Sequence, residues 1–498
     1  MPKRRPPAKN LLAAVLLLGF VGGIQTVDPI ISSVALVRAS SELHFTANIT
    51  ALASGISTLA LAATVIASGL LADKLGRRKV LLAALLVSIV GDVLVAMSTG
   101  TSMYLLGRVI AGIGLGGVFS AAFAYVRAVA GNKLGTALGQ FSAMGGVTTM
   151  LGGLVGGVLV TTNWRLAYLV VPIFCVLAFV LVPLLLPKEP AIKGVRIDGV
   201  GLGLIALGTT GILYGISKAT DSLTAPITWV PILVGICSLV IFAVLETNKK
   251  NPILPMSLFK SRVFIAAVIS VMLWNLFQAV IVLQLSNLWQ YVEHFTPTKV
   301  TFGQLPLSIV SIIAAIIAGR SLTKGKSPRS RILLGFVLIA LGFGSLFVLP
   351  TSGTYMLYLP ALLLIGVGLP YVVIASGQLF MSEAPPKFFG PVTSSKTTIG
   401  QFGYALGLAG SMVMVDNLTK AGITQKLTAA NVPPFQVGQA LDSVSQYVNT
   451  GVHANTEAAR TALQVAAQSY SSAFSTTMLI MAITALLTGV TSFMLIKK

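Results

Sequence analysis

Three ionisable side chains interrupt long apolar stretches of the sequence: Asp28, Asp92 and Arg108. An ionisable group near the centre of a membrane helix costs about 2.5–3.5 kcal/mol, so it persists for function or because it is paired. A buried carboxyl group can be neutral in one conformation and ionised in another, which is the chemistry that a proton carrier needs. We therefore expect Asp28 to be the proton-coupling acid and Arg108 to tune it. The alternative is a structural ion pair that does not titrate, and for Asp92 this alternative is the stronger one.

The three residues are expected at similar depths. Counted at about 1.5 Å per helical residue, all of them lie in the outer half of the membrane, roughly 9–14 Å below its outer surface. Asp92 and Arg108 occur on consecutive antiparallel helices, so the sequence permits a direct pair between them. Whichever carboxylate pairs with Arg108, the other is left without a full cationic partner.

Polar and aromatic side chains at mid-depth form a second group, in the second half of the chain. Pockets for drug-like compounds are mostly apolar, with a few polar groups that fix orientation. Each of these residues could instead serve hydrogen bonding between helices. Lys396 lies near the inner end of its apolar run and is expected to extend to the cytoplasm, with anion binding as the alternative. The candidates for substrate binding are Trp274, Asn275, Gln278, Tyr371, Gln378, Gln401 and Tyr404.

The composition indicates which elements position these residues. Of 498 residues, 55% are hydrophobic and 9% are charged, whereas soluble proteins carry about a quarter charged residues. This composition excludes a soluble enzyme and a disordered chain. Fourteen apolar runs are long enough to cross a membrane, for which a helix needs about 20 residues. The sequence therefore predicts an all-α polytopic membrane protein with 14 transmembrane helices.

No constellation of residues indicates an enzyme. The sequence contains no glycine-rich loop ending in Lys and Ser or Thr that would bind nucleotide phosphates. Its His and Cys residues are not clustered as metal ligands, so we expect neither a metal site nor a cofactor. Any energy source would then be an ion gradient, and protons are the expected coupling ion.

The distribution of basic residues predicts the orientation in the membrane. Most of the 34 Lys and Arg residues fall in loops on the side of the N-terminus, and few fall on the opposite side. Because positively charged loops stay inside, both termini are expected in the cytoplasm. The net charge of +21 is thus explained by topology and contact with anionic lipid, and it does not indicate a nucleic-acid partner.

The apolar runs divide into groups of six, two and six. We expect an N-terminal six-helix bundle over residues 1–190, a two-helix linker over residues 191–260 and a C-terminal six-helix bundle over residues 261–498. A polar outer loop, residues 417–472, separates the last two runs, Val392–Asp416 and Ala473–Leu495. Apolar residues recur in this loop at helical spacing, which predicts a short helical hairpin on the outer face. Its role is either a packing cap on the last two helices or a lid over the outer exit.

A basic segment joins the second and third runs. Its glycines permit a tight turn, and Asp73 can lie at a helix N-terminus or pair with a neighbouring arginine. The segment resembles the signature of the major facilitator superfamily. The cluster is expected to latch the cytoplasmic ends of helices in one state and release them in the other. The latch residues within Gly69–Lys79 are Gly69, Asp73, Gly76, Arg77 and Arg78.

Three further segments narrow the resemblance. Val27–Leu36, Leu106–Gly114 and Glu246–Phe259 resemble the first-helix motif, the fourth-helix motif and the linker of the fourteen-helix drug:proton antiporter branch. The resemblance implies that Arg108 lies opposite Asp28. The fifth-helix antiporter motif departs from the pattern, because Gly153 stands where proline is expected. Its glycines still offer two faces for close helix contact, formed by Gly152 with Gly156 and by Gly153 with Gly157.

These observations and the resemblance favour a transporter. We expect proton-coupled efflux of amphiphilic organic compounds, including drugs, by alternating access. The expected location is the cytoplasmic (inner) membrane, and the expected state is a monomer. One alternative is export of a lipid or anionic metabolite, or proton-coupled uptake. A second alternative is a non-transporting sensor or partner-binding protein.

Overall fold

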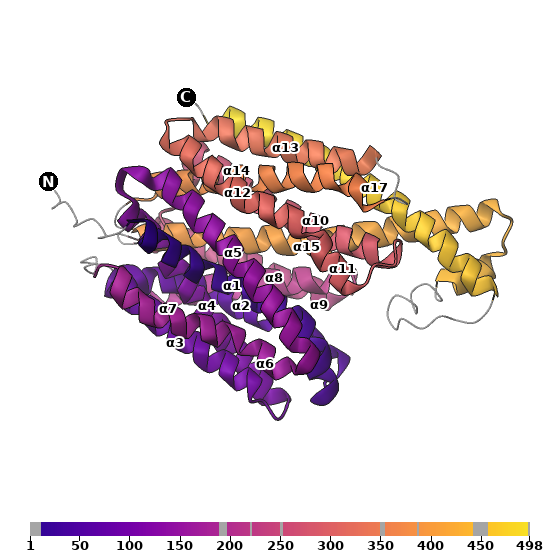
Figure 1. Cartoon of the computed structure of the whole chain (residues 1–498), viewed down its shortest axis with the longest axis horizontal. Coiled ribbons are helices and arrows are strands. Elements are labelled where there is room, and N and C mark those ends of the chain that lie inside the picture. The colour runs from indigo at the N-terminus through magenta and orange to yellow at the C-terminus, as the bar shows by residue number, and fades with distance from the viewer. Residues whose placement is uncertain are drawn as a thin grey trace.

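The computed structural model describes residues 11–188, 197–219, 222–249, 252–348, 354–385, 388–441 and 457–496. The basic residues from Lys3 to Lys9, the expected boundary at residues 190–191 and residues 442–456 of the outer loop lie outside the described residues. Apart from short turns, the described chain is helical, which confirms the expected all-α fold (Figure 1).

The first group of helices precedes residue 188. Its boundaries follow local signals, because Gly76 and Gly131 adopt positive φ values of 97° and 52°, which glycine tolerates best. Gly76 thereby separates the second helix from the third, and Gly131 ends the fourth. The helices are α1 (Leu11–Glu42), α2 (Ala47–Leu75), α3 (Arg77–Ala96), α4 (Thr101–Ala130), α5 (Leu134–Thr162), α6 (Trp164–Tyr168) and α7 (Val170–Leu185).

A linker pair and a second group follow. The pair comprises α8 (Gly199–Lys218) and α9 (Pro226–Thr247), which pack on each other, and α8 also contacts α2. The second group comprises α10 (Arg262–Tyr291), α11 (Pro297–Gly303), α12 (Leu305–Thr323), α13 (Pro328–Val348), α14 (Leu359–Glu383), α15 (Phe389–Ala429) and α17 (Glu457–Leu495).

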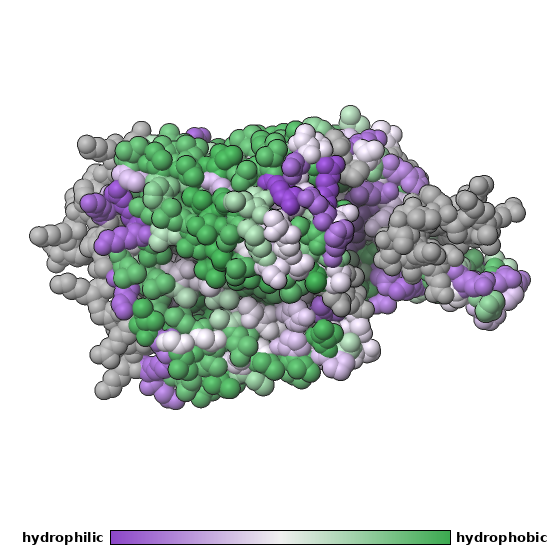
Figure 2. Space-filling view, turned by 90° about the horizontal axis from the view of Figure 1, so that it is seen from below, coloured by the Kyte–Doolittle hydropathy of each residue, from purple (hydrophilic) through white to green (hydrophobic). Residues whose placement is uncertain are grey.

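The described helices are built to cross a membrane. Thirteen helical stretches are long and apolar enough, and one of them, Thr101–Thr162, contains both α4 and α5. The described chain therefore contains fourteen segments long and apolar enough to cross a membrane, the number that was expected. Large apolar side chains point outward on these helices, such as Leu184 and Ile173 with 73% and 62% exposure. Figure 2 shows this apolar surface on one flank of the molecule, with polar side chains mainly toward its two ends. Such a surface is stable in a lipid bilayer.

We call the two ends of the molecule the proximal face and the distal face. The proximal face is the end at which α1 begins and α17 finishes, at the left in Figure 1, and the distal face is the opposite end. Helices α1 to α7 pack mainly on one another, and so do α10 to α17. The two groups meet where α2 contacts α15 and where α5 contacts α12. In Figure 1 they lie close at the proximal end and diverge toward the distal end.

Glycines make the contact between α5 and α12 possible. A Cβ atom added at Gly139 would lie 2.5 Å from the carbonyl oxygen of Ala315, and one added at Gly319 would lie 2.4 Å from the carbonyl oxygen of Gly135. Both distances are too short for a real side chain. The backbones of the two groups therefore approach as closely as small residues allow.

The expected outer hairpin exists, but its arms differ from the expectation. Helix α15 runs without a break to Ala429, and α17 is continuous to Leu495, so both transmembrane helices extend into the segment that was expected to be a separate loop. Residues 434–441 form a further short helical segment between them. The extension projects from the distal end of the molecule (Figure 1). It has a small core of its own, which explains why the helices continue, formed by Ile423, Leu427, Val437 and Ala466.

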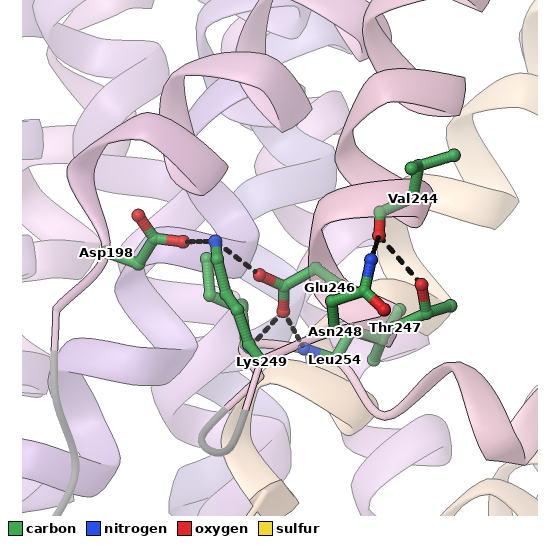
Figure 3. A network of polar contacts seen from close by, with 8 residues as sticks. Asp198, Val244, Glu246, Thr247, Asn248, Lys249 and Leu254 are labelled. Carbon is green, nitrogen blue, oxygen red and sulfur yellow. Dashed lines mark hydrogen bonds and ion pairs between the residues drawn. The ribbon is translucent and has the colours of Figure 1, made fainter.

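A polar network closes the linker pair at the proximal face (Figure 3). Lys249 donates to Asp198 at the start of α8 and, at 2.9 Å, to Oε1 of Glu246 near the end of α9. The buried Oε2 atom of Glu246 accepts from the backbone N–H groups of Ile253 and, at 3.3 Å, Leu254. The Lys249 ammonium holds the pKa of Asp198 below its usual value, and the two carboxylates raise the pKa of Lys249. The network thus ties the start of α8 to the end of α9 and to the segment that follows α9.

Candidate functional site

Asp28 on α1 and Arg108 on α4 form a buried ion pair. Arg108 Nη1 donates to Asp28 Oδ1, and Arg108 Nη2 donates to Asp28 Oδ2 at 3.1 Å. The hydroxyl of Ser57 on α2 also donates to Asp28 Oδ2, at 3.0 Å. Each charged side chain is 1% exposed. Two parallel charge-assisted hydrogen bonds are the strongest geometry for this pair, and the pairing implied by the resemblance is confirmed.

Asp92 on α3 is the second carboxyl group near Arg108. Its Oδ1 atom lies 4.0 Å from Arg108 Nη1, and the side chain is fully buried. Among the described residues neither carboxyl oxygen of Asp92 has a hydrogen-bond partner. The sequence left both pairings open, and the structure brings all three residues together with unequal contacts. Two carboxyl groups therefore compete for one guanidinium group.

Four hydroxyl groups lie around the pair that sequence reasoning did not single out. Besides Ser57, the ring of Tyr168 lies 5.5 Å from the Arg108 guanidinium carbon, and its hydroxyl is 2.6 Å from that of Tyr104. The Tyr168 hydroxyl also donates to Ser32 Oγ at 3.3 Å. Tyr104 precedes Arg108 by four residues and so shares its helix face, which was a usable signal. Nothing in the sequence placed Ser57 or Tyr168, because hydroxyl groups are common in membrane helices.

The fifth-helix glycines position α1 around Asp28. A Cβ atom added at Gly152 would lie 2.6 Å from Val27 Cγ1, and one added at Gly156 would lie 2.6 Å from Ile31 Cγ1. The first expected glycine face is thus in tight contact with the helix that carries the acid. The second face is used only in part. An added Cβ would meet α1 at 3.2 Å at Gly153, but nothing within 4 Å at Gly157. The expected close contact is therefore wrong for Gly157, whose side of the helix is open.

The latch segment joins the two groups of helices at the proximal face. The backbone N–H of Gly390, in the first turn of α15, donates to Asp73 Oδ2, and Arg77 Nη2 donates to Asp73 Oδ1 at 3.3 Å. The Arg77 guanidinium also lies 5.2 Å from the centre of the Phe389 ring. Asp73 thus does both things that its position allowed, because it pairs with an arginine and binds a helix N-terminus.

The other latch residues have separate roles. Gly76 forms the turn between α2 and α3. Gly69 lies inside α2 rather than in that turn, and a Cβ atom there would lie 2.7 Å from the Gly390 carbonyl oxygen. The expected turn role is therefore wrong for Gly69, which instead permits close contact between α2 and α15. Arg78 donates to the carbonyl oxygens of Leu186 and Pro183, so it ties α3 to the end of α7 within the first group.

The residues expected to bind substrate lie on α10, α14 and α15, at varied depths of burial. Asn275 packs against α15, because a Cβ atom added at Gly400 would lie 2.8 Å from its Nδ2 atom. The Trp274 Nε1 and Gln378 Oε1 atoms are buried and have no hydrogen-bond partner among the described residues. Tyr371 is buried, and the remaining three are partly buried: Gln278, Gln401 and Tyr404. Their role in binding stays a prediction.

Lys396 on α15 does not extend to the proximal surface as expected. The residue is 8% exposed, and its Nζ atom lies 4.8 Å from the centre of the Phe123 ring on α4. The expectation is wrong because the side chain turns toward the other group of helices, where an aromatic face covers it.

Comparison of the sequence with known protein families identifies the family to which this arrangement belongs. Residues 11–408 match the sequence pattern of the Major Facilitator Superfamily, most of the chain. The chain belongs to that superfamily. It is therefore a multi-pass membrane transporter of small molecules rather than an enzyme.

Curated major facilitator proteins resemble the chain over most of its length. It is 28% identical to the uncharacterized MFS-type transporter YfiU of Bacillus subtilis, over 70% of this chain and 69% of that protein. It is 26% identical to a multidrug resistance protein B homolog of Mycobacterium tuberculosis, over 66% of this chain and 62% of that protein. It is also 25% identical to the probable transport protein HsrA of Haemophilus influenzae, over 79% and 85%.

Solved major facilitator structures share the fold. The human organic anion transporter MFSD10 superposes with a TM-score of 0.61 at 14% identity, covering 97% of this chain and all of that chain. The proton:xylose symporter XylE gives 0.60 at 12% identity, covering 96% and 94%. At these identities the similarity is one of fold alone.

Proposed function

We propose that the chain exports amphiphilic organic compounds across the cytoplasmic membrane in exchange for protons. The observation that carries this proposal is the arrangement of Asp28, Asp92 and Arg108 around one another. Two buried carboxyl groups next to one permanently charged guanidinium are electrically balanced when they share a single proton. A site of this kind can hold one proton and pass it on.

The contacts suggest how the proton is held. In the described conformation Arg108 binds Asp28, and Asp92 accepts no hydrogen bond from a described residue. Protonation of Asp28 would remove the charge that holds Arg108, because a neutral carboxyl group forms weaker bonds to guanidinium. Arg108 stays charged and needs a carboxylate, and Asp92 at 4.0 Å is within reach. Exchange of Arg108 between the two acids is the step we assign to proton coupling, with Asp28 as the coupling acid.

Alternating access connects this step to transport. The proximal face is closed by contacts between the two groups of helices, including Gly390 N–H to Asp73. Movement of Arg108 shifts α4 relative to α1 and α3, and α4 also contacts α15 of the second group. A proton bound from the distal side would thus favour opening of the proximal side. In this proposal the proximal face is cytoplasmic, the membrane is the inner membrane and the unit of transport is one chain.

The fold also allows uptake by symport, and a solved structure of similar fold belongs to a proton:xylose symporter. The direction of proton movement separates the two modes. Everted membrane vesicles expose the cytoplasmic face, and their interior can be acidified and followed with a pH-sensitive dye. Pyrenylbutyl probes with a sulfonate, a hydroxyl or a trimethylammonium headgroup keep the apolar body constant and carry no titratable group. Export by antiport predicts release of interior protons when a transported probe is added, whereas symport predicts none under this gradient.

Asp28→Asn is the decisive variant for the acid. It is expected to abolish proton release, because Asn cannot gain or lose the proton. Asp416→Asn is the matched control, since Asp416 is exposed on α15 and its ion-pair partner among the described residues is Lys420, one turn away. Proton release by correctly folded Asp28→Asn protein at the rate of the Asp416→Asn control would refute the assignment.

A further inference from the structure

Lys396 is a buried cation that the coupling step does not use. We propose that it forms a subsite for the anionic headgroup of an amphiphilic substrate, such as a sulfonate, carboxylate or phosphate on an apolar body. This inference rests on the proposed function, because it names the substrate class of the same transport path. The observations that carry it are the burial of Lys396, the nature of its contact and its position between the two groups of helices.

The surroundings of Lys396 are apolar and aromatic. Its Nζ atom faces the ring of Phe123, and a Cβ atom added at Gly377 on α14 would lie 3.7 Å from both Lys396 Cε and Phe123 Cζ. Among the described residues no carboxylate lies within ion-pair distance of Lys396. An aromatic face compensates a buried ammonium only in part. The ammonium group thus retains most of its capacity to bind an anion.

Neighbouring polar atoms are also without partners. Thr397 and Thr398 follow Lys396 on α15 and are 8% and 4% exposed, and neither hydroxyl oxygen has a hydrogen-bond partner among the described residues. The Oε1 atom of Gln378, next to Gly377 on α14, is likewise buried and unpartnered. Buried hydroxyl groups without partners are uncommon in folded proteins. Thr397 and Thr398 point to other sides of α15 than Lys396, so these atoms do not surround the ammonium group itself. They show that this level of the interface holds hydrogen-bonding groups that a polar ligand group would satisfy.

The position of Lys396 places this subsite on the transport path. Phe123 belongs to α4 of the first group and Lys396 to α15 of the second, so their contact lies across the interface that alternating access opens. One turn away on α4, Arg127 reaches the carbonyl oxygen of Met381 and the ring of Phe389 across the same interface. Opening of the proximal face would separate Lys396 from Phe123 and expose the ammonium group. An anionic headgroup entering from that side then replaces the ring as its partner.

A purely structural role is the competing explanation, in which the contact between Lys396 and Phe123 only holds the proximal face closed. The two explanations differ in their dependence on ligand charge. A structural contact affects all probes alike, whereas an anion subsite affects the charged headgroup only. The conservative and neutral variants at this position therefore separate them.

The test measures binding to the purified protein by fluorescence anisotropy of the pyrenylbutyl probes. The wild-type protein is expected to bind the sulfonate about tenfold more tightly than the hydroxyl probe, the factor of a single charge-assisted hydrogen bond. Lys396→Gln is expected to bind both probes equally, with its affinity for the hydroxyl probe unchanged, and Lys396→Arg to retain the preference. Lys420→Gln on the same helix is the matched control, because Lys420 is exposed and pairs with Asp416.

Two results would overturn the inference: no preference of the wild-type protein for the sulfonate, or an undiminished preference in Lys396→Gln. Intact binding of the hydroxyl probe shows that the variant is folded. Equilibrium binding needs no proton gradient, so a failure of proton antiport in vesicles leaves this test readable, and the reverse also holds.

The anion can come from a soluble amphiphile or from a lipid headgroup. Competition distinguishes these sources. Displacement of the sulfonate probe by short-chain phosphatidylglycerol, but not by phosphatidylcholine of equal chain length, would support the subsite with a lipid phosphate as its source. Displacement by an unlabelled alkyl sulfonate alone would support it with a soluble amphiphile.

Discussion

The two groups of helices bury their charges in opposite ways. In the first group Arg108 is 1% exposed and donates from both terminal nitrogens to Asp28. Asp92 Oδ1 lies 4.0 Å from Arg108 Nη1. In the second group Lys396 is 8% exposed and contacts an aromatic ring instead of a carboxylate. Removing one partner of a buried ion pair leaves an uncompensated charge and lowers stability, whereas a buried charge without a carboxylate partner already carries that cost unless a ligand supplies the partner. This difference agrees with our proposals that the first group binds the coupling proton and the second group binds the substrate headgroup.

The largest expected effect comes from removing the paired charge. Arg108→Met leaves Asp28 buried without a cation, and breaking a buried pair from one side typically costs about 3–5 kcal/mol. The free energy of unfolding in mixed detergent micelles should fall by that order, and proton release in vesicles should disappear. Arg108→Lys serves as the control, since it keeps the charge but loses the two-pronged contact. Wild-type stability of Arg108→Met would show that the pair is not what balances Asp28.

A second prediction concerns what the two groups share, their close backbone contacts at the proximal face. Gly69 on α2 faces α15, and Gly319 on α12 faces α5. Valine at either position forces the helices apart, and overpacking of this kind costs about 1–3 kcal/mol. The closed proximal face should lose stability relative to the open one. Spin-label distances across the proximal face should lengthen in both variants.

Gly203 on α8 provides the control for those measurements, because a Cβ atom there would meet nothing within 4 Å. Gly203→Val should leave the spin-label distances at wild-type values. Unchanged distances in both Gly69→Val and Gly319→Val would contradict the role of these contacts in holding the face closed.

The unpaired charge should respond with the opposite sign. Lys396→Met removes a buried ammonium that has no carboxylate partner in the described part of the chain, and apolar replacement of buried charges is often neutral or stabilising by about 1 kcal/mol or more. The melting temperature of the ligand-free protein is therefore expected to stay the same or rise. Arg108→Met under identical conditions should lower it. Equal destabilisation by both substitutions would remove the contrast between the two groups.

The smallest effect is expected in the linker pair, which lies outside both groups. The pKa of Asp198 is lowered by its bond to Lys249, so this contact stabilises the protein above the ordinary pKa of Asp, about 4. The contribution is lost as the pH falls through the lowered pKa. Because both side chains are about a quarter to a third exposed, at 25% and 31%, it should remain below about 1 kcal/mol. Melting temperatures of wild-type and Asp198→Asn protein should therefore differ near pH 7 and converge as the pH falls below the lowered pKa of Asp198, and a constant difference would contradict the assignment.

Much of the fold could be predicted from the sequence, because apolar run length and loop charge are local properties. Fourteen crossings and the outer hairpin followed from them. The continuous extension of α15 to Ala429 could not, since it depends on a small core that residues such as Ile423 and Val437 form only after the hairpin closes. The same limit applies to Gly69, whose contact with Gly390 joins residues far apart in the chain.

The candidate site divides in the same way. Asp28, Asp92 and Arg108 stand out because charge inside an apolar run is conspicuous in one dimension. Ser57 and Tyr168 do not, because a hydroxyl group in a membrane helix is ordinary until its neighbour is known. Lys396 was expected at the surface for a related reason, since the sequence does not reveal that Phe123 lies opposite it.

The most direct test of these separate roles measures proton release by everted vesicles. It compares Asp28→Asn with Lys396→Gln, each with the hydroxyl and the sulfonate probe. Asp28→Asn is expected to release protons with neither probe. Lys396→Gln is expected to release them normally with the hydroxyl probe and to need about tenfold more sulfonate for the same rate. Equal losses with both probes in Lys396→Gln, or normal release in Asp28→Asn, would contradict the assignment of the proton to one group and the substrate to the other.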